Sequence, residues 1–295
     1  MKRFKLLALL CVAALGCAAV LAGCSSQSYT PPQKTQTVPA SALSTANTLR
    51  VGVNAQAAPL AGQTASSSEI VGIDVDVAAA IADEMGVKLE VVDVGRAAES
   101  ALSEGRVDIV LGIDTSTSDS SYWRSDPYLS TGVALFAPQS ATSIPSTDSK
   151  PVIAAQTSSK SSWRVTNLFG DSSLVSQSDL KSAFTAMGSG MAQYVAADAV
   201  IGTYIAHTNN FDSKIVALLQ DPSGYCVGVA ANNRELQNAV TSALNKITNG
   251  GVIDVIETKW LGASVDTTNM TVIKSATAAA ASSSSSSATS DQNEE

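Results

Sequence analysis

The chain has 295 residues, a formal net charge of −8 and four cysteines. An acidic chain lacks the basic face that nucleic-acid binding requires, so we expect no nucleic-acid partner. Three cysteines lie within the first 24 residues and only Cys226 lies beyond them, which excludes a disulfide or a cysteine metal site in the remainder.

The N-terminus has the features of an export signal. Three cations within the first five residues precede an apolar run over residues 6–21. The run is short for a membrane span and lacks a stop-transfer flank, so residues 1–23 are predicted to be a signal peptide. Leu21-Ala22-Gly23-Cys24 is similar to the bacterial lipobox, which implies a lipid on Cys24 and a lipoprotein on the extracytoplasmic face of the cell membrane. The alternative is an ordinary signal peptide followed by an unmodified cysteine.

Two segments flank the central region. Residues 24–48 are rich in Ser, Thr, Gln and Pro, which is typical of a flexible tether. Residues 264–295 end in a long Ala/Ser run, and we expect this tail to be disordered. About 215 residues lie between them, enough for one two-lobed unit or two small domains.

The first half of this region alternates strands and helices. Apolar periodicity predicts strands over 49–53, 88–94 and 107–111, and helices over 72–86 and 97–103. Asp74 and Asp76 fall in the first turn of the helix over 72–86. We interpret them as helix-capping residues, because carboxylates there favour the positive end of the helix dipole.

The second half repeats the alternation. Strands are expected over 151–155, 199–201 and 225–230, the last of which buries Cys226, and helices over 160–169, 179–195, 234–247 and 252–260. Strands that alternate with helices predict an α/β protein with two mostly parallel sheets.

Six motifs, in order, resemble a known family. They are Leu49-Arg-Val-Gly-Val53 with Ala58-Pro59, Gly72-Ile-Asp-Val-Asp-Val77, Ala101-Leu-Ser-Glu-Gly-Arg-Val-Asp-Ile-Val110, Ser125-Asp-Pro-Tyr128, Asp198-Ala-Val-Ile201 and Gly251-Val-Ile-Asp-Val-Ile-Glu-Thr-Lys-Trp-Leu-Gly262. Together they make the chain similar to the family 3 extracellular solute-binding proteins. These are the polar amino-acid receptors of bacterial ABC importers.

The resemblance implies an α/β, two-lobed type II periplasmic binding protein fold. Two crossing strands, near Ala134–Pro138 and Val227–Ala230, would join the sheets. Lobe 1 would then contain 49–137 and 229–263, and lobe 2 would contain 138–228. The resemblance also implies a monomer that closes around a small polar solute and meets an ABC permease in the membrane.

The residues that hold an amino-acid zwitterion in the family differ here. The family arginine that binds the α-carboxylate falls on Ser118 or Asp119, and the aspartate that binds the α-ammonium falls on Thr203. A hydroxyl after Val110 becomes Asp114, and Thr157-Ser-Ser-Lys160 replaces a Gly-Thr-Thr turn. We therefore expect a cleft lined by Asn54, Asp114, Asp119, Ser159 and Thr203.

Three functions are compatible with this pattern. A lipid-anchored receptor of an ABC importer, altered toward a cation or a polyol by Asp114 and Asp119, is the first; both acids could instead be solvated loop residues. A scaffold or sensor that has lost its ligand is the second. An enzyme on the same fold is the third, but His207 is the only histidine and no Ser/His/Asp set, carboxylate pair or metal cluster is present in the sequence. We expect no catalytic residue, cofactor or metal.

Overall fold

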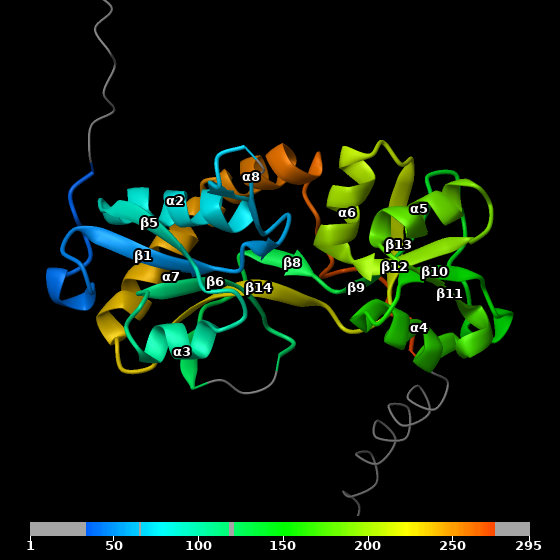
Figure 1. The fold of residues 1–295 in the computed structure, drawn as a ribbon, viewed down its shortest axis with the longest axis horizontal. Coiled ribbons are helices and arrows are strands. Elements are labelled where there is room, and N and C mark those ends of the chain that lie inside the picture. Colours follow the sequence, from blue (N-terminus) through cyan, green and yellow to red (C-terminus); the bar gives the residue numbers. More distant parts are fainter. Residues whose placement is uncertain (1–33, 65, 118–120, 275–295) are drawn as a thin grey trace, which may run out of the picture. The chain divides into compact units, whose positions relative to one another are not determined.

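The structure is a computed structural model, which describes residues 34–64, 66–117 and 121–274. These residues form two α/β lobes, each built on its own sheet (Figure 1). Lobe 1 is defined here as the elements on the six-stranded sheet, and lobe 2 as the elements on the five-stranded sheet. The predicted two-lobed α/β architecture is confirmed, but both sheets are mixed rather than mostly parallel, because each contains parallel and antiparallel pairs.

The sheet of lobe 1 is parallel at one edge and antiparallel at the other. Its strands are β1 (Thr48–Val53), β5 (Lys88–Asp93), β6 (Ile109–Asp114), β7 (Tyr122–Arg124), β8 (Leu129–Thr131) and β14 (Ser223–Ala230). They lie in the order β5-β1-β6-β14-β7, with β8 also paired to β14. Between β1 and the helix that starts at Ile73, the chain forms a separate small sheet of β2 (Gln56–Ala57), β3 (Ala61–Gln63) and β4 (Ile70–Val71).

Four α-helices belong to lobe 1 among the described residues. They are α2 (Ile73–Met85), α3 (Ala98–Ser103), α7 (Arg234–Asn249) and α8 (Val252–Leu261). Helices α2 and α8 lie on one side of the sheet and α3 on the other (Figure 1). Leu49, Val51 and Val53 of β1 are fully buried, and as alternate residues of the strand they share one face of the sheet.

Lobe 2 has the same design. Its strands β9 (Val133–Pro138), β10 (Ile153–Gln156), β11 (Leu174–Gln177), β12 (Tyr194–Asp198) and β13 (Ser213–Leu218) lie in the order β11-β10-β12-β9-β13. Its helices are α4 (Lys160–Phe169), α5 (Leu180–Gly188) and α6 (Ala199–Thr208). Three short 3-10 helices, η2 (Ala40–Ala42), η3 (Thr147–Ser149) and η4 (Asp171–Ser173), complete the described elements.

The prediction for residues 179–201 is wrong in part. Helix α5 ends at Gly188, the strand is β12 over 194–198, and residues 199–201 begin α6 rather than forming a strand. The Asp198 carboxylate explains the difference, because it accepts hydrogen bonds from the backbone amides of Val200 and Ile201 and so caps the helix. A short apolar run does not by itself distinguish a strand from a buried helix.

The predicted capping role of Asp74 and Asp76 is also wrong. Neither carboxylate makes a side-chain cap hydrogen bond to α2. The Asp74 carboxylate is buried and accepts a hydrogen bond from the Tyr128 hydroxyl at 2.6 Å. The Asp76 carboxylate accepts one from the Trp260 indole at 2.7 Å, which connects α2 to α8. Both carboxylates therefore bond to side chains outside α2 and not to the amides at its start.

The chain passes between the lobes at other residues than expected. Strand β9 belongs entirely to lobe 2 and β14 entirely to lobe 1, so the passages are Gly132 and residues 219–222. The expected crossings at 134–138 and 227–230 lie within the sheets. A third passage follows α8: Ile273 donates its amide to the carbonyl of Leu218 at 2.8 Å, and Ile273 is buried in lobe 2.

The two flanking segments are more ordered than predicted. Residues 264–274 pack against lobe 2 and are not a disordered tail, whereas 275–295 lie outside the described residues. Residues 34–48 are not a tether either: the Thr37 amide donates to the Met85 carbonyl, Val38 is buried, and the Ser44 amide donates to Asp108. Residues 24–33 lie outside the described part.

Candidate functional site

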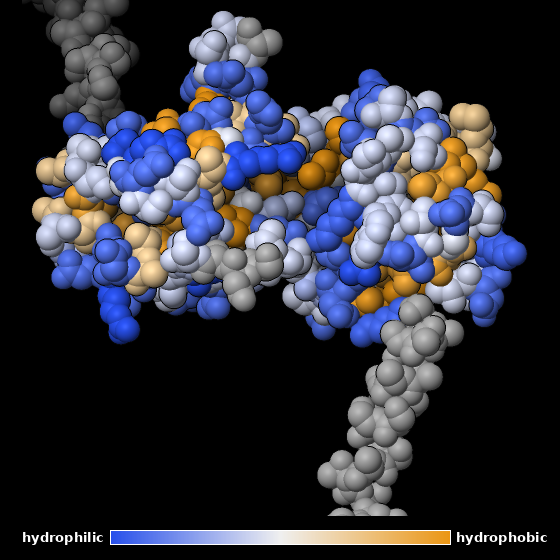
Figure 2. Space-filling view, turned by 60° about the horizontal axis from the view of Figure 1, so that its bottom comes forward, coloured by the Kyte–Doolittle hydropathy of each residue, from blue (hydrophilic) through white to orange (hydrophobic). Residues whose placement is uncertain are grey.

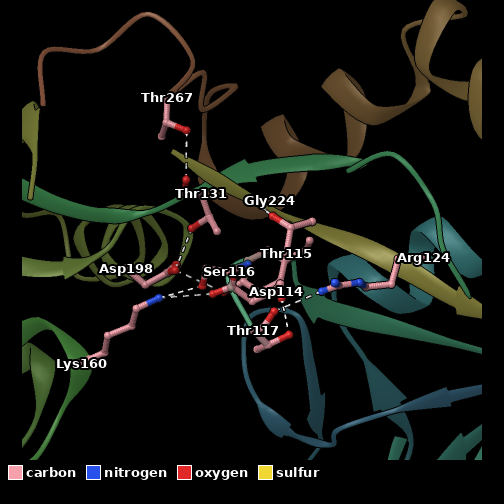
Figure 3. Close-up of polar contacts among 11 residues, drawn as sticks. Asp114, Thr115, Ser116, Thr117, Arg124, Thr131, Lys160, Asp198, Gly224 and Thr267 are labelled. Carbon is pink, nitrogen blue, oxygen red and sulfur yellow. Dashed lines mark hydrogen bonds and ion pairs between the residues drawn. The ribbon is translucent and has the colours of Figure 1, made fainter. Parts of the chain in front are cut away.

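A cation of lobe 2 reaches a polar loop of lobe 1. Lys160 is the first residue of α4, and its Nζ donates a hydrogen bond to Oγ of Ser116 at 2.9 Å (Figure 3). The same Nζ lies 3.7 Å from Oδ2 of Asp114, the last residue of β6. Both members of the ion pair are partly exposed, so the pair itself contributes at most about 1 kcal/mol. Its importance is that it connects the two lobes.

Helix α4 is positioned by its first turn. The Ser159 hydroxyl accepts a hydrogen bond from the Ser162 amide at 3.0 Å, and the Ser162 hydroxyl accepts one from the Ser159 amide at 3.1 Å. This capping box satisfies two amides that the helix leaves free. It also fixes Lys160 at the first helical position, from which its side chain extends toward lobe 1 (Figure 3).

The loop of lobe 1 that faces Lys160, residues 115–117, is held in place by hydrogen bonds on two sides. Thr115 donates its amide to the Gly224 carbonyl at 2.8 Å, and the Thr115 hydroxyl accepts from the Gly224 amide at 3.0 Å. On the other side, Nη1 of Arg124 donates to the Thr117 carbonyl at 3.3 Å (Figure 3). The Arg124 guanidinium therefore supports the loop.

A half-buried carboxylate connects the lobes at a second point. Asp198 at the end of β12 accepts hydrogen bonds from the hydroxyls of Thr131, at 2.7 Å, and Tyr225, at 3.2 Å, both in lobe 1 strands. It also accepts the two amides that begin α6. Burial raises the pKa of Asp198 above its usual value, while the four donors oppose that shift. Burial also raises the pKa of Tyr225, and the nearby Asp198 charge adds to this effect.

The five residues expected in the cleft have different environments. Asp114 lies at the contact between the lobes, and Ser159 is the helix cap beside Lys160. Oδ1 of Asn54 accepts from the Gln56 amide at 3.1 Å in the turn after β1. Thr203 is half-buried in α6, and Asp119 lies outside the described residues. Within the described part of the chain, neither Asn54 nor Thr203 bonds to another of the five.

Sequence reasoning missed three participants in this site. Lys160 was recognised as an added cation but was not placed in the cleft, and Thr131 and Tyr225 were not recognised at all. Asp198 provided a usable signal, because a carboxylate between an apolar strand and an apolar helix must obtain donors from somewhere. No pattern in the sequence identifies hydroxyls 67 and 27 residues away as those donors.

A hollow lies at this junction of the lobes. Figure 2 shows hydrophilic residues on both sides of the space between the two lobes. A pocket of about 320 Å³ is lined by Thr115 and Ser116 of lobe 1, Lys160 and Arg164 of lobe 2, residues 220–222 of the second passage, and Ser223 at the start of β14. The arrangement offers hydroxyls, cations and a carboxylate to a small polar molecule.

His207 and Cys226 do not line this pocket. His207 is exposed in the last turn of α6. Within residues 34–64, 66–117 and 121–274, no three His, Cys, Asp or Glu side chains form a group that could hold a metal ion. Over the same ranges, no helix has both the length and the apolar character of a membrane span. Cys226 is buried in β14, as expected, and burial raises its pKa to about 11.

Three amino-acid receptors of known structure share this fold. The L-cystine solute receptor of Neisseria gonorrhoeae in its unliganded open conformation matches with a TM-score of 0.65 and 22% identity, over 74% of this chain and 95% of that one. A polar amino acid ABC uptake transporter substrate-binding protein from Streptococcus thermophilus matches with a TM-score of 0.66 and 17% identity, over 75% and 88%. An ancestral cationic amino acid solute-binding protein matches with a TM-score of 0.62 and 24% identity, over 73% and 96%.

These similarities establish the type II periplasmic binding protein fold that the sequence predicted. Comparison with curated proteins finds no significant match. The family model for bacterial extracellular solute-binding proteins, family 3, matches residues 49–263, which is well over half of the chain. The chain therefore belongs to the family 3 bacterial extracellular solute-binding proteins.

Proposed function

We propose that this chain is the lipid-anchored, extracytoplasmic receptor of an ABC importer and captures a small polar solute between its lobes. Family membership supports a solute-binding role outside the cytoplasm. Related folds occur in an L-cystine receptor and in a polar amino acid uptake receptor, which favours an amino-acid-like solute. The altered zwitterion-binding positions favour a changed set of contacts within that class.

One observation carries the proposal. Lys160 of lobe 2 contacts Ser116 and Asp114 of lobe 1 across the junction, where a captured solute has to touch both lobes. These groups are partly exposed and can exchange their mutual contacts for contacts with a solute. A protein that needed only a rigid scaffold would gain little from exposed polar groups there, because exposed ion pairs contribute little stability.

A thermal-shift screen of the purified protein tests capture. Amino acids, polyamines, sugars and osmolytes are added one at a time, and the unfolding temperature is measured. A solute at about a hundredfold its dissociation constant adds about 2.7 kcal/mol of stability to the folded state. If no solute class raises the unfolding temperature, the receptor proposal fails and the scaffold or sensor is favoured.

The anchor is a separate part of the proposal, since Cys24 lies outside the described residues. Its support is the lipobox-like Leu21-Ala22-Gly23-Cys24. Cells that express the full chain with radiolabelled palmitate should incorporate label, and Cys24→Ala should abolish it. Cys17→Ala, the matched control, should keep the label. Labelling that survives Cys24→Ala would contradict the assignment.

The partner and the oligomeric state follow from the same role. A receptor that delivers solute is expected to act as a monomer and to bind a membrane permease with an ATPase. Light scattering of the purified protein should give about 30 kDa before removal of the leader. Co-purification from detergent extracts should recover the permease. Recovery of the protein alone after cross-linking in transporting cells would argue against an importer.

A further inference from the structure

The pocket at the lobe junction has an unusual balance of charge. Lys160 and Arg164 are four residues apart on α4 and therefore share one face of the helix. The one acidic side chain in its described lining is Asp221, which is exposed and already paired with Lys274 at 3.3 Å. Among the described residues Arg164 has no ion-pair partner, whereas Lys160 also lies 3.7 Å from Oδ2 of Asp114, which is outside the lining.

Two polar groups in this lining lack partners. Nε of Arg164 and Oγ of Ser223 are both shielded from solvent, and neither has a hydrogen-bond partner among the described residues. Buried polar groups in native proteins are almost always hydrogen-bonded, so two unsatisfied groups in the lining of one pocket require an explanation. Nε of arginine is only a donor, and a hydroxyl can donate, so an oxyanion is a suitable acceptor for either group.

Lys160 is available to join them. Its hydrogen bond to Ser116 and its 3.7 Å ion pair with Asp114 lie in a partly exposed environment, where such contacts exchange readily. Arg164 also lies over the exposed Trp163 ring, at 5.4 Å from its centroid, which supports one side of the guanidinium. A planar guanidinium held in this way is well suited to a planar carboxylate.

We propose that this pocket binds a carboxylate group of the captured solute, through the guanidinium of Arg164, the ammonium of Lys160 and the hydroxyl of Ser223. The inference rests on the proposed receptor function and specifies its substrate class. A volume of about 320 Å³ fits a small solute, at the lower end of the range for small-molecule sites. In this site both cations that would bind the carboxylate come from α4 of lobe 2.

Matched pairs of probes test the assignment by isothermal titration. Each pair consists of a carboxylate and a primary amide of the same shape. The pairs are L-glutamine and its α-amide, 4-aminobutyrate and 4-aminobutanamide, and succinate and succinamide. Every solute found in the thermal-shift screen is titrated with its amide in the same way. We expect the solute to be a carboxylate and its amide to bind at least about tenfold more weakly.

Variants separate this inference from the receptor function. Arg164→Gln should weaken carboxylate binding about tenfold to a hundredfold, Lys160→Gln and Ser223→Ala should weaken it less, and Arg164→Lys should retain part of the affinity. Lys181→Gln, an exposed cation on α5 of the same lobe, is the control and should leave binding unchanged. Circular dichroism verifies that each variant is folded, and Ser223→Ala remains informative if Arg164→Gln does not fold.

The outcomes distinguish the two proposals. If a solute binds equally well to wild type, Arg164→Gln and Ser223→Ala, or if only solutes without a carboxylate bind, the carboxylate site is wrong and the receptor function stands. If no probe or screened solute binds, the receptor function fails and the carboxylate site fails with it.

Discussion

Two carboxylates, the buried Asp74 and the half-buried Asp198, show how differently the core of lobe 1 and the junction of the lobes surround a charge. Asp74, within lobe 1, accepts one side-chain hydrogen bond, from Tyr128. Asp198, at the junction, accepts four, from two hydroxyls and two amides. Burial raises the pKa of both, and that of Asp74 to about 7. The junction therefore supplies the donors that a carboxylate needs, whereas the core of lobe 1 favours the neutral acid.

The largest expected effect is the loss of Asp198. Asp198→Ala removes the cap of α6, which costs about 1–2 kcal/mol, and leaves two hydroxyls without an acceptor, which costs about 1–3 kcal/mol each. We expect the free energy of unfolding, measured by urea denaturation, to fall by about 3–5 kcal/mol. Asp179→Ala removes the exposed cap of α5 and should produce a much smaller loss. Equal losses would show that the junction contacts contribute nothing.

Asp74 should make stability depend on pH. Because its pKa is about 7 in the folded protein and 3.8 is the ordinary value, the folded state binds the proton more tightly. The stabilisation is complete below about pH 4 and is lost as pH rises to about 7, at about 1.4 kcal/mol per unit of pKa difference. Asp74→Asn should reduce the fall in unfolding free energy between pH 4 and 8 by about 2–4 kcal/mol. An unchanged pH profile would contradict the neutral acid.

Gly112 tests how closely the chain packs against Asp74. Its φ is +76°, and a Cβ there would lie 2.6 Å from Oδ2 of Asp74. Left-handed backbone costs a side-chain-bearing residue about 1–2 kcal/mol, so Gly112→Ala should lower the unfolding free energy by about 2 kcal/mol or more. In an Asp74→Ala background the cost should fall, because the close contact is gone. Strictly additive losses would show that the carboxylate is not the obstacle.

The smallest expected effect concerns the third passage. The fully buried Thr267 donates its hydroxyl to the Thr131 carbonyl at 3.1 Å, beside the Asp198 cluster. Thr267→Val should lower the unfolding free energy by about 1 kcal/mol, because it removes one buried hydrogen bond. Thr268→Val, at the neighbouring exposed position, should have less effect in the same denaturation experiment. A larger loss at 268 would contradict the role given to the Thr267 hydrogen bond.

The sequence predicted regular elements well where the apolar pattern was long or capped. The helix expected near 160–169 is α4, and the structure shows that Ser159 caps its start and Gly170 follows its end. The pattern failed over residues 199–201, where three apolar residues fit either a strand or a helix. It also failed for 264–274, where buried residues such as Val265, Thr267 and Ile273 are too widely spaced to give a period.

The candidate site was less accessible to sequence reasoning. Asp114 and Ser159 could be located by alignment with family motifs, and the structure places Lys160, next to Ser159, against Asp114. The contacts that join the lobes depend on residues far apart in the chain, such as Ser116 with Lys160, so no local pattern encodes them. The third passage adds a connection that the resemblance did not imply.

The central claim is that a solute binds where Lys160 meets lobe 1. Isothermal titration of the solute identified in the screen into wild type, Lys160→Gln and Lys181→Gln tests it most directly. We expect Lys160→Gln to raise the dissociation constant severalfold or more and Lys181→Gln to leave it unchanged. Equal affinity for all three proteins would show that the solute binds elsewhere.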